Sequence, residues 1–253
     1  MKVFIINLKR SKDRKIFMQS QIKKLFAYNP NLKNQLEFNF FEAVDGSKNE
    51  YLQFKSHFPW WSSFILGREL NSNEKSCFAS HYSLWIKCQK LNKPIIILED
   101  DVIFSKEFLN NVNIIKILLN ANYEYIRLHY SFNKRIKKIN DNFFQSTENI
   151  NGALGYFLHP NAANKFTKKK YWFKPVDIYM DMYYYHKVSN IIYKPFLIHS
   201  SSLSSTIGER NDKPKNIMKK IIREFFRFYF YIYKISYSTK RGLFLCFTNI
   251  LKK

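Results

Sequence analysis

Hydrophobic and polar residues alternate along the chain in blocks that predict strands and helices in turn. Residues Lys2 to Leu8 are rich in β-branched and aromatic side chains and predict a buried strand. Ser11 is the expected N-cap of the helix that follows, and Pro30 ends that helix. A second strand is predicted from Glu37 to Ala43, before the turn at residues 44–46. This β-α-β order favours a parallel sheet covered by helices.

The middle of the chain continues the alternation. Residues 47–70 are aromatic and irregular and predict a surface loop with a short helix. Asn73 is expected to cap a helix from Glu74 to about Leu91. The wholly apolar segment Ile95 to Leu98 is typical of a central strand of a parallel sheet. Beyond it the pattern predicts a helix at 106–119, a strand at 123–129, a polar stretch to 150, a strand at 152–158, a helix at 161–169, a helix after Pro175 and a strand at 191–198.

The C-terminal segment, residues 213–253, differs in composition from residues 1–212. It holds eleven of the 42 basic residues and one of the 19 acidic residues, a net charge of +10 against +13 for the rest. At about 100° per residue, its charged residues from Lys219 to Lys234 fall in an arc of roughly 140°, and apolar and aromatic residues fill the remainder. This pattern is typical of a helix that lies in a membrane interface with its cations toward anionic headgroups. The alternative is a helix packed back on the domain with a solvated basic face.

Overall composition narrows the class of protein. The chain has 253 residues and a formal net charge of +23, and 46% hydrophobic residues with 18% aromatic residues exclude global disorder. The three cysteines form no C-x-x-C pair, which excludes a disulfide framework and a four-cysteine zinc site and favours a reducing compartment. No apolar run reaches the roughly 20 residues of a membrane span or matches a signal-peptide core. We therefore expect a protein of the cytosol or its membrane face, with nucleic-acid binding as an alternative that only the charge supports.

Three acidic residues, Glu99, Asp100 and Asp101, follow directly after the most apolar strand. Adjacent carboxylates repel one another and persist most easily when a cation neutralises them. Mg²⁺ and Mn²⁺ take few protein carboxylates and complete their coordination with water and phosphate oxygens. The carboxyl edge of a parallel sheet is also where open α/β folds bind ligands. The triplet therefore predicts a divalent-metal site, against the alternative of a solvated turn that caps the next helix.

Basic residues in the first strand-to-helix turn, at positions 7–14, predict a diphosphate site at a helix N-terminus. Arg10 and Arg14 are four residues apart and project from one side of that first turn. Neither a dinucleotide-binding glycine fingerprint nor a P-loop is present. A phosphodiesterase that uses the acidic triplet is a weaker alternative, because no second cluster of metal ligands is visible.

Two pairs of residues at helical i, i+4 spacing are further candidates. Cys77 and His81 could hold a metal, but no second ligand pair accompanies them, and His81 suits a buried core position equally well. Asp177 and Asp181 share one face of the helix after Pro175, with exposed acids beside lysines as the alternative.

With these residues in place, the chain resembles the family 25 glycosyltransferases, the bacterial lipooligosaccharide galactosyltransferases related to collagen galactosyltransferases. The resemblance covers about residues 1–210. Where the family usually has G-E-x-G-C, this chain has Asn73 to Cys77 with both glycines replaced. The matching segments are V-F-I-I-N-L-K-R-S-K-D-R at 3–14, A-V-D-G at 43–46, N-E-K-S-C-F-A-S-H-Y-S-L-W at 73–85, I-I-L-E-D-D-V at 96–102, G-A-L-G-Y-F-L at 152–158 and P-V-D at 175–177.

The resemblance implies a GT-A fold: a Rossmann-like, mostly parallel sheet flanked by helices over residues 1–212, followed by the amphipathic tail. It also implies a nucleotide-sugar donor, Mn²⁺ or Mg²⁺, and inversion at the anomeric carbon, which needs a base for the acceptor hydroxyl. The implied donor-binding residues are Asn7, Arg10, Arg14, Asp45, Glu99 and Asp100; the implied metal ligands are Asp101, Glu99 and His199; the candidate bases are Asp177, then Asp181 and Glu74.

The function expected from this resemblance is transfer of galactose, by a β-1,4 linkage, from UDP-galactose to a lipid-linked oligosaccharide core. UDP-N-acetylgalactosamine, UDP-N-acetylglucosamine and UDP-glucose remain alternative donors. The enzyme is expected at the inner face of a bacterial cytoplasmic membrane, where residues 213–253 contact the anionic surface. No nucleic-acid partner is expected.

Overall fold

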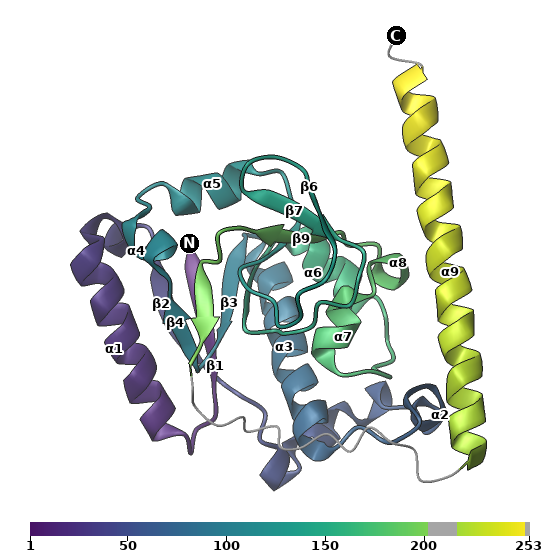
Figure 1. The fold of residues 1–253 in the computed structure, drawn as a ribbon. Helices are drawn as coiled ribbons and strands as arrows, with labels where there is room; N and C mark the ends of the chain where they lie inside the picture. The colour runs from purple at the N-terminus through teal and green to yellow at the C-terminus, as the bar shows by residue number, and fades with distance from the viewer. Residues whose placement is uncertain (202–216, 251–253) are drawn as a thin grey trace.

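The computed structural model describes residues 1–201 and 217–250, and its core is an eight-stranded sheet (Figure 1). The strand order in that sheet is β2-β1-β3-β8-β5-β9-β7-β6, and β4 and β10 form a separate antiparallel pair. The strands are β1 (Lys2–Asn7), β2 (Glu37–Glu42), β3 (Ile95–Glu99), β4 (Val102–Phe104), β5 (Tyr125–Arg127), β6 (Ile136–Lys138), β7 (Phe143–Ser146), β8 (Gly155–Leu158), β9 (Asn190–Tyr193) and β10 (Ile198–Ser200).

The sheet is mixed but mostly parallel. β1 pairs in parallel with both β2 and β3, and β5 pairs in parallel with β9. β8 is antiparallel to β3 and β5, and β7 is antiparallel to β9 and β6. Six of the eight strands described in this sheet therefore point the same way, all except β7 and β8, which confirms the predicted α/β class.

Helices cover both faces of the sheet (Figure 1). They are α1 (Lys12–Tyr28), α2 (Ser62–Leu66), α3 (Ser72–Leu91), α4 (Lys106–Asn110), α5 (Ile114–Asn120), α6 (Pro160–Thr167), α7 (Val176–Asp181), α8 (Tyr183–His186) and α9 (Ile217–Ile250), with 3-10 turns η1 (Pro30–Asn34), η2 (Gly46–Lys48) and η3 (Glu50–His57).

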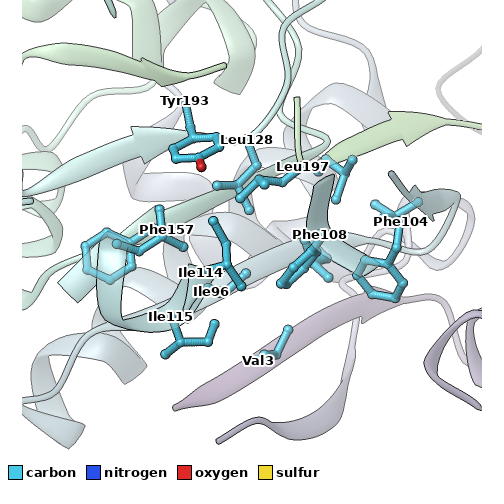
Figure 2. Packing of buried hydrophobic residues seen from close by; sticks show 14 of the residues in the cluster. Val3, Ile96, Phe104, Phe108, Ile114, Ile115, Leu128, Phe157, Tyr193 and Leu197 are labelled. Atoms are coloured by element: carbon cyan, nitrogen blue, oxygen red, sulfur yellow. The ribbon is translucent and has the colours of Figure 1, made fainter. Parts of the chain in front are cut away.

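Alternating side chains of the central strands supply two cores. In β1, Val3 and Ile5 belong to a cluster with α1, α4 and α5, whereas Phe4 belongs to a cluster with α3 and α6. Because both faces of a central strand are buried, its sequence is apolar throughout rather than alternating. Figure 2 shows the first cluster, in which Ile96 and Phe157 of the sheet lie close to the α5 residues Ile114 and Ile115.

Several helices and strands begin or end at residues other than those predicted. The helix expected over 106–119 is two helices, because Asn111 adopts an extended conformation and its side chain accepts a hydrogen bond from the Asn113 backbone. The strand expected over 191–198 breaks at Pro195, which has no N–H for a ladder hydrogen bond. The polar stretch before Ile150 contains β6 and β7, whose polar residues suit the edge of a sheet and hide the strand pattern.

The tail is helical, as predicted, and α9 packs on the domain. Phe230 stacks on Phe173 with ring centroids 5.6 Å apart, and the Tyr183 hydroxyl lies 3.1 Å from the Ser238 hydroxyl. Among the described residues, no helix has the length and apolarity needed to cross a membrane. The predicted boundary at residue 212 lies outside the described residues.

A buried ion pair joins the second half of the sheet to α7. The Arg127 guanidinium donates to Asp181 Oδ1 at 2.8 Å, and both side chains are almost wholly buried. Asn190 of β9 donates to the same carboxylate, and the Asn151 backbone donates to its other oxygen. Both oxygens of Asp181 thus accept hydrogen bonds inside the fold and hold α7 in place, and its predicted role as a base stays a prediction.

We expect Arg127→Met to destabilise the protein by about 3–5 kcal/mol, because Asp181 is left buried without its cation. The double variant Arg127→Met/Asp181→Asn should recover part of this loss. Urea unfolding followed by circular dichroism measures both. Lys138→Met is the control, because it breaks an exposed pair with Asp141 and should cost less than about 1 kcal/mol. An Arg127→Met variant as stable as this control would contradict the assignment.

Candidate active site

The ends of three parallel strands meet at one edge of the sheet and form a pocket there. In the register, Asn7 at the end of β1 lies opposite Glu42 of β2, and Ile6 lies opposite Glu99 of β3. The segments that follow these strands therefore converge, as parallel pairing requires. Residues after all three strands line the pocket together with one face of α3.

Asp100, directly after β3, fixes the turn between β1 and α1 to the sheet. Its carboxylate accepts a hydrogen bond from the Asn7 side-chain amide at 2.8 Å and another from the Arg14 guanidinium in the first turn of α1. Burial raises the pKa of Asp100 above its usual value, although Asn7 and Arg14 both act in the opposite direction. The predicted donor residues Asn7, Arg14 and Asp100 are thus brought together, and their mutual contacts hold the turn in place.

The carboxylate of Asp101 has fewer hydrogen-bond partners to offset its charge than that of Asp100. Arg14 donates to its Oδ2 at 3.4 Å, while Oδ1 is buried and has no hydrogen-bond partner in the described part of the chain. Burial and the neighbouring Glu99 raise the pKa of Asp101 to about 6, against the lowering effect of Arg14. A buried carboxylate oxygen without a partner is the donor type that Mn²⁺ and Mg²⁺ prefer.

Asp45 and Arg10 close the pocket on the β2 side. The Arg10 guanidinium donates to the Asp45 carboxylate and, at 2.9 Å, to the Ser47 hydroxyl. Burial acts to raise the pKa of Asp45, but hydrogen bonds from Arg10 and Ser47 outweigh it, and the pKa lies below its usual value. Gly46 is required here because a Cβ would lie 2.5 Å from Asn73 Oδ1 and 3.0 Å from the Ser72 backbone.

Helix α3 begins two residues earlier than predicted. Asn71, not Asn73, is the N-cap, and it forms a capping box with Glu74. Both oxygens of Glu74 also accept hydrogen bonds from Arg68, at 2.7 and 2.8 Å. These contacts give Glu74 a structural role at the helix start, and its predicted role as a base stays a prediction.

Cys77, His81 and Glu99 form a compact group inside the pocket. One ligand atom from each lies within 4.8 Å of the other two, and His81 Nε2 is 3.7 Å from Glu99 Oε1. The other ring nitrogen, Nδ1, is 2.8 Å from the Tyr156 hydroxyl. Glu99 thus adds a third side chain of metal-ligating type to the Cys77–His81 pair. A sulfur, a nitrogen and an oxygen suit Zn²⁺ better than Mn²⁺ or Mg²⁺.

A second pocket adjoins the first and contains Asp177. Its lining residues include Glu74, Cys77, Glu99 and Asp177, together with the loop around Gly152. Cys77 and Glu99 also line the first pocket, so the two pockets meet at these residues. Asp177 lies at the start of α7, where its carboxylate accepts from the Ile178 backbone at 2.9 Å. Its predicted role as a base stays a prediction.

His199 lies on β10, beside the strand that follows the acidic triplet. The Ser201 backbone donates to the Asp101 carbonyl at 2.9 Å, which places the end of β10 next to Asp101. The His199 side chain is exposed, and its ring centroid is 6.1 Å from that of His129. Burial and the neighbouring His199 lower the pKa of His129 to about 4. The metal-binding role of His199 stays a prediction.

Several pocket residues were not among the predicted site residues. Ser76 and Ser80 line the first pocket, and the Ser80 hydroxyl accepts a hydrogen bond from the Val44 backbone at 2.9 Å. Their i, i+4 spacing on the face that carries Cys77 and His81 was the available signal. Arg68 had no such signal, because its partner Glu74 and its position depend on the folded loop before α3.

Comparison with known proteins identifies the family. The profile described as "Glycosyltransferase family 25 (LPS biosynthesis protein)" matches residues 1–182. A "Glycosyltransferase 25 family member" of Drosophila melanogaster is 29% identical over 195 residues, which cover 72% of this chain and 30% of the relative.

Two further relatives match shorter segments. "Procollagen galactosyltransferase 2" of Homo sapiens is 35% identical over 42% of the chain and 16% of its own length. "Lipooligosaccharide biosynthesis protein lic2B" of Haemophilus influenzae is 30% identical over 41% of the chain and 34% of its own length. The matched region thus spans about a third or less of each of these relatives. Because the profile matches residues 1–182 of this chain of 253 residues, the chain belongs to glycosyltransferase family 25.

Proposed function

We propose that the protein is an inverting glycosyltransferase that moves a sugar from a UDP-sugar donor to a saccharide acceptor. The observation that carries this proposal is the pair of adjoining pockets that share Cys77 and Glu99. The first lies at the carboxyl edge of the sheet, where α/β folds bind nucleotides, and the second contains a carboxylate suited to act as a base. Donor and acceptor would meet where the pockets join.

On the donor side, the turn between β1 and α1 would bind the diphosphate. The Arg10 side chain is 47% exposed and lines the pocket, so its guanidinium can donate to phosphate oxygens while Asp45 orients it. Arg14 is engaged by Asp100 and Asp101, so it sets the positions of the acidic residues. These charges favour the negative charge that develops on the leaving UDP.

On the acceptor side, Asp177 would remove the proton from the attacking hydroxyl. Arg127 donates to the Asp177 carbonyl at 3.3 Å, and Asp181 of the same helix is paired with Arg127. These contacts hold α7 in place. The base would therefore be held in the wall of the pocket that Cys77 and Glu99 also line.

The proposed cofactor is Mn²⁺ or Mg²⁺. The unpartnered oxygen of Asp101 fits such an ion, with Glu99 and His199 as the other proposed ligands. When bound, the ion supplies Lewis-acid stabilisation of the diphosphate leaving group.

Galactose is the proposed sugar, and a lipid-linked oligosaccharide core at the inner face of a bacterial membrane is the proposed acceptor. The support is the names of two relatives, a procollagen galactosyltransferase and a lipooligosaccharide biosynthesis protein. A β-1,4 linkage is proposed with this sugar. UDP-glucose, UDP-N-acetylglucosamine and UDP-N-acetylgalactosamine are the alternative donors, and the assay below includes them.

We further propose that α9 holds the protein on an anionic membrane. Its aromatic residues Phe226, Phe230 and Tyr233 pack on the domain, which leaves a second apolar face in contact with solvent. This exposed face comprises Ile217, Met218, Ile221, Phe225, Phe228, Tyr229, Tyr231, Ile232 and Ile235, all at least 45% exposed. Such a stripe beside basic residues, in a segment with a net charge of +10, complements anionic headgroups.

We expect Asp177→Asn to lower kcat by about 100-fold to 10,000-fold, because the amide cannot accept the hydroxyl proton. The assay is acceptor-dependent release of UDP from each of the four UDP-sugars, with Mn²⁺ and truncated lipooligosaccharide. Asp141→Asn, at an exposed acid, is the matched control. Release of UDP by the Asp177→Asn variant at the control rate would exclude Asp177 as the base, and no acceptor-dependent release from any donor would refute the proposed function.

Asp101→Asn should remove most of the gain in UDP affinity that Mn²⁺ provides, a loss of at least about tenfold, because a direct ligand is lost. Titration calorimetry of UDP with and without Mn²⁺ measures this gain. Cys77→Ser separates the two possible metal sites: it should leave the gain intact if Asp101 holds the ion. The opposite pattern, with the gain lost only in Cys77→Ser, would move the metal to the Cys77–His81–Glu99 group.

The triple variant Ile221→Ser/Phe225→Ser/Phe228→Ser should partition at least about 100-fold less strongly into phosphatidylglycerol-containing vesicles, because three apolar side chains no longer enter the interface. Co-sedimentation measures the partition. The matched control, Ile16→Ser/Leu52→Ser/Trp60→Ser, removes equally exposed apolar side chains from other surfaces. Equal sedimentation of the two variants would disprove the membrane role of α9.

A further inference from the structure

Three side chains of metal-ligating type meet where the two pockets join. Cys77 and His81 lie one turn apart on the same face of α3, and Glu99 is the last residue of β3. One potential ligand atom from each lies within 4.8 Å of the other two. Cys77 and Glu99 line both pockets, and His81 lines the first. The group therefore lies where the proposed donor and acceptor would meet.

His81 is almost completely buried, and one of its ring nitrogens lacks a hydrogen-bond partner. The side chain is 1% exposed, and Nε2 has no hydrogen bond with any residue that the structure describes. Glu99 Oε1 lies 3.7 Å from Nε2, which is beyond hydrogen-bond distance. Leaving a buried polar atom unpaired costs stability. A cation between Nε2 and Oε1 would give this nitrogen a partner.

The other ring nitrogen of His81 is held by a hydroxyl group. Nδ1 lies 2.8 Å from the Tyr156 hydroxyl, and that hydroxyl accepts a hydrogen bond from the Trp85 indole at 2.8 Å. The hydroxyl oxygen has a second lone pair, so it can also accept the Nδ1 proton. In that tautomer Nε2 carries a lone pair on the side of Glu99. A histidine held in this way through one nitrogen is typical of metal ligands.

The spacing of the group suits zinc. Zn–N and Zn–O bonds of about 2.0–2.2 Å and a Zn–S bond of about 2.3 Å place tetrahedral ligand atoms about 3.3–3.6 Å apart. The 3.7 Å between His81 and Glu99 is close to this, and a group within 4.8 Å needs to contract by only about 1 Å. Because Phe78 and Trp85 pack α3 on the sheet, the backbone of all three ligands is held in place.

We propose that Cys77, His81 and Glu99 bind Zn²⁺ and that the bound ion inhibits sugar transfer. A thiolate, an imidazole and a carboxylate form a donor set that favours Zn²⁺ over Mn²⁺ and Mg²⁺. Three protein ligands leave a fourth position for water. The Cys77 thiol releases its proton to solvent when it binds the ion. The inhibition rests on the proposed function, whereas the binding does not.

Bound Zn²⁺ would interfere with transfer in two ways. It would lie at the residues that both pockets share, and so close the junction between donor and acceptor. It would also hold the Glu99 carboxylate toward His81 and withdraw it from the metal site proposed at Asp101. The two metal sites are therefore distinct, but they compete for one carboxylate.

Cobalt substitution tests the zinc site on the untagged full-length protein without any turnover. Tetrahedral Co²⁺ gives visible d–d bands, and a thiolate ligand adds a sulfur-to-cobalt charge-transfer band in the near ultraviolet. The protein should show both signals. An equimolar amount of Zn²⁺ should remove them and the same amount of Mn²⁺ should not, because a donor set with a thiolate favours Zn²⁺. Absence of the charge-transfer band would overturn the proposal.

Two variants locate the ion. Cys77→Ser should abolish the charge-transfer band and weaken Zn²⁺ binding at least about 100-fold, more than the loss of a supporting contact costs. His81→Gln should weaken binding by a similar factor; competition with a chromophoric chelator measures both affinities, and circular dichroism checks both folds. Cys246→Ser, which removes a cysteine outside the group, is the matched control and should bind like the unaltered chain. Unchanged affinity in Cys77→Ser, or loss of the band in Cys246→Ser, overturns the site.

Inhibition is measured for each variant as the ratio of its own rates of UDP release with and without Zn²⁺, at saturating Mn²⁺. Zn²⁺ at ten times its dissociation constant should slow the unaltered chain and Cys246→Ser about tenfold, by mass action. Cys77→Ser should show a ratio near unity, and equal slowing of all three would overturn inhibition through this site. The cobalt signals without sugar transfer from any donor would refute the proposed function alone, and transfer without these signals would refute the zinc site alone.

Discussion

The arrangement of the site depends on the burial of two adjacent carboxylates beside a single guanidinium. Asp100 and Asp101 both contact Arg14, so one positive charge serves two negative ones at the end of a buried strand. Breaking such a buried contact leaves an uncompensated charge, which makes the position of α1 against the sheet strongly determined. The turn that carries Arg10 is fixed as a consequence. The charge that Arg14 does not neutralise is also the physical basis of the cation site proposed at Asp101.

Features that depend on local pattern were predictable from the sequence. The apolar strand Ile95–Leu98 had to be central, and the acidic triplet after it had to lie at the carboxyl edge of the sheet, because the preceding strands are parallel to it. Asn7, Arg14 and Asp100 come from segments that follow parallel neighbours, so their convergence follows from topology. No knowledge of individual contacts was needed for this part of the site.

Features that depend on a distant partner were not predictable. Asp177 and Asp181 share a helical face, and spacing alone cannot distinguish them. Arg127, far away in the sequence, pairs with Asp181 and leaves the Asp177 carboxylate at the pocket. The tail shows the same limit, since a helical wheel separates charged from apolar residues but cannot show that the apolar part divides into a packed face and an exposed face. In both cases the tertiary neighbour decides which side chains are paired or packed inside the fold.

Acidic residues are scarce in this chain, which has a net charge of +23, and several of them form ion pairs inside the fold. Asp181 pairs with Arg127 and Glu74 with Arg68, so acids that a less basic protein would display on its surface hold internal elements in place. Basic residues also line the surface where α9 meets the domain, and Arg10 and Arg14 line the pocket at the turn after β1. Each of these places adjoins one of the two pockets that share Cys77 and Glu99. The basic turn after β1 thus suits the anionic donor proposed for the first pocket, and aromatic contacts such as that of Phe230 with Phe173 dock α9 on the other side.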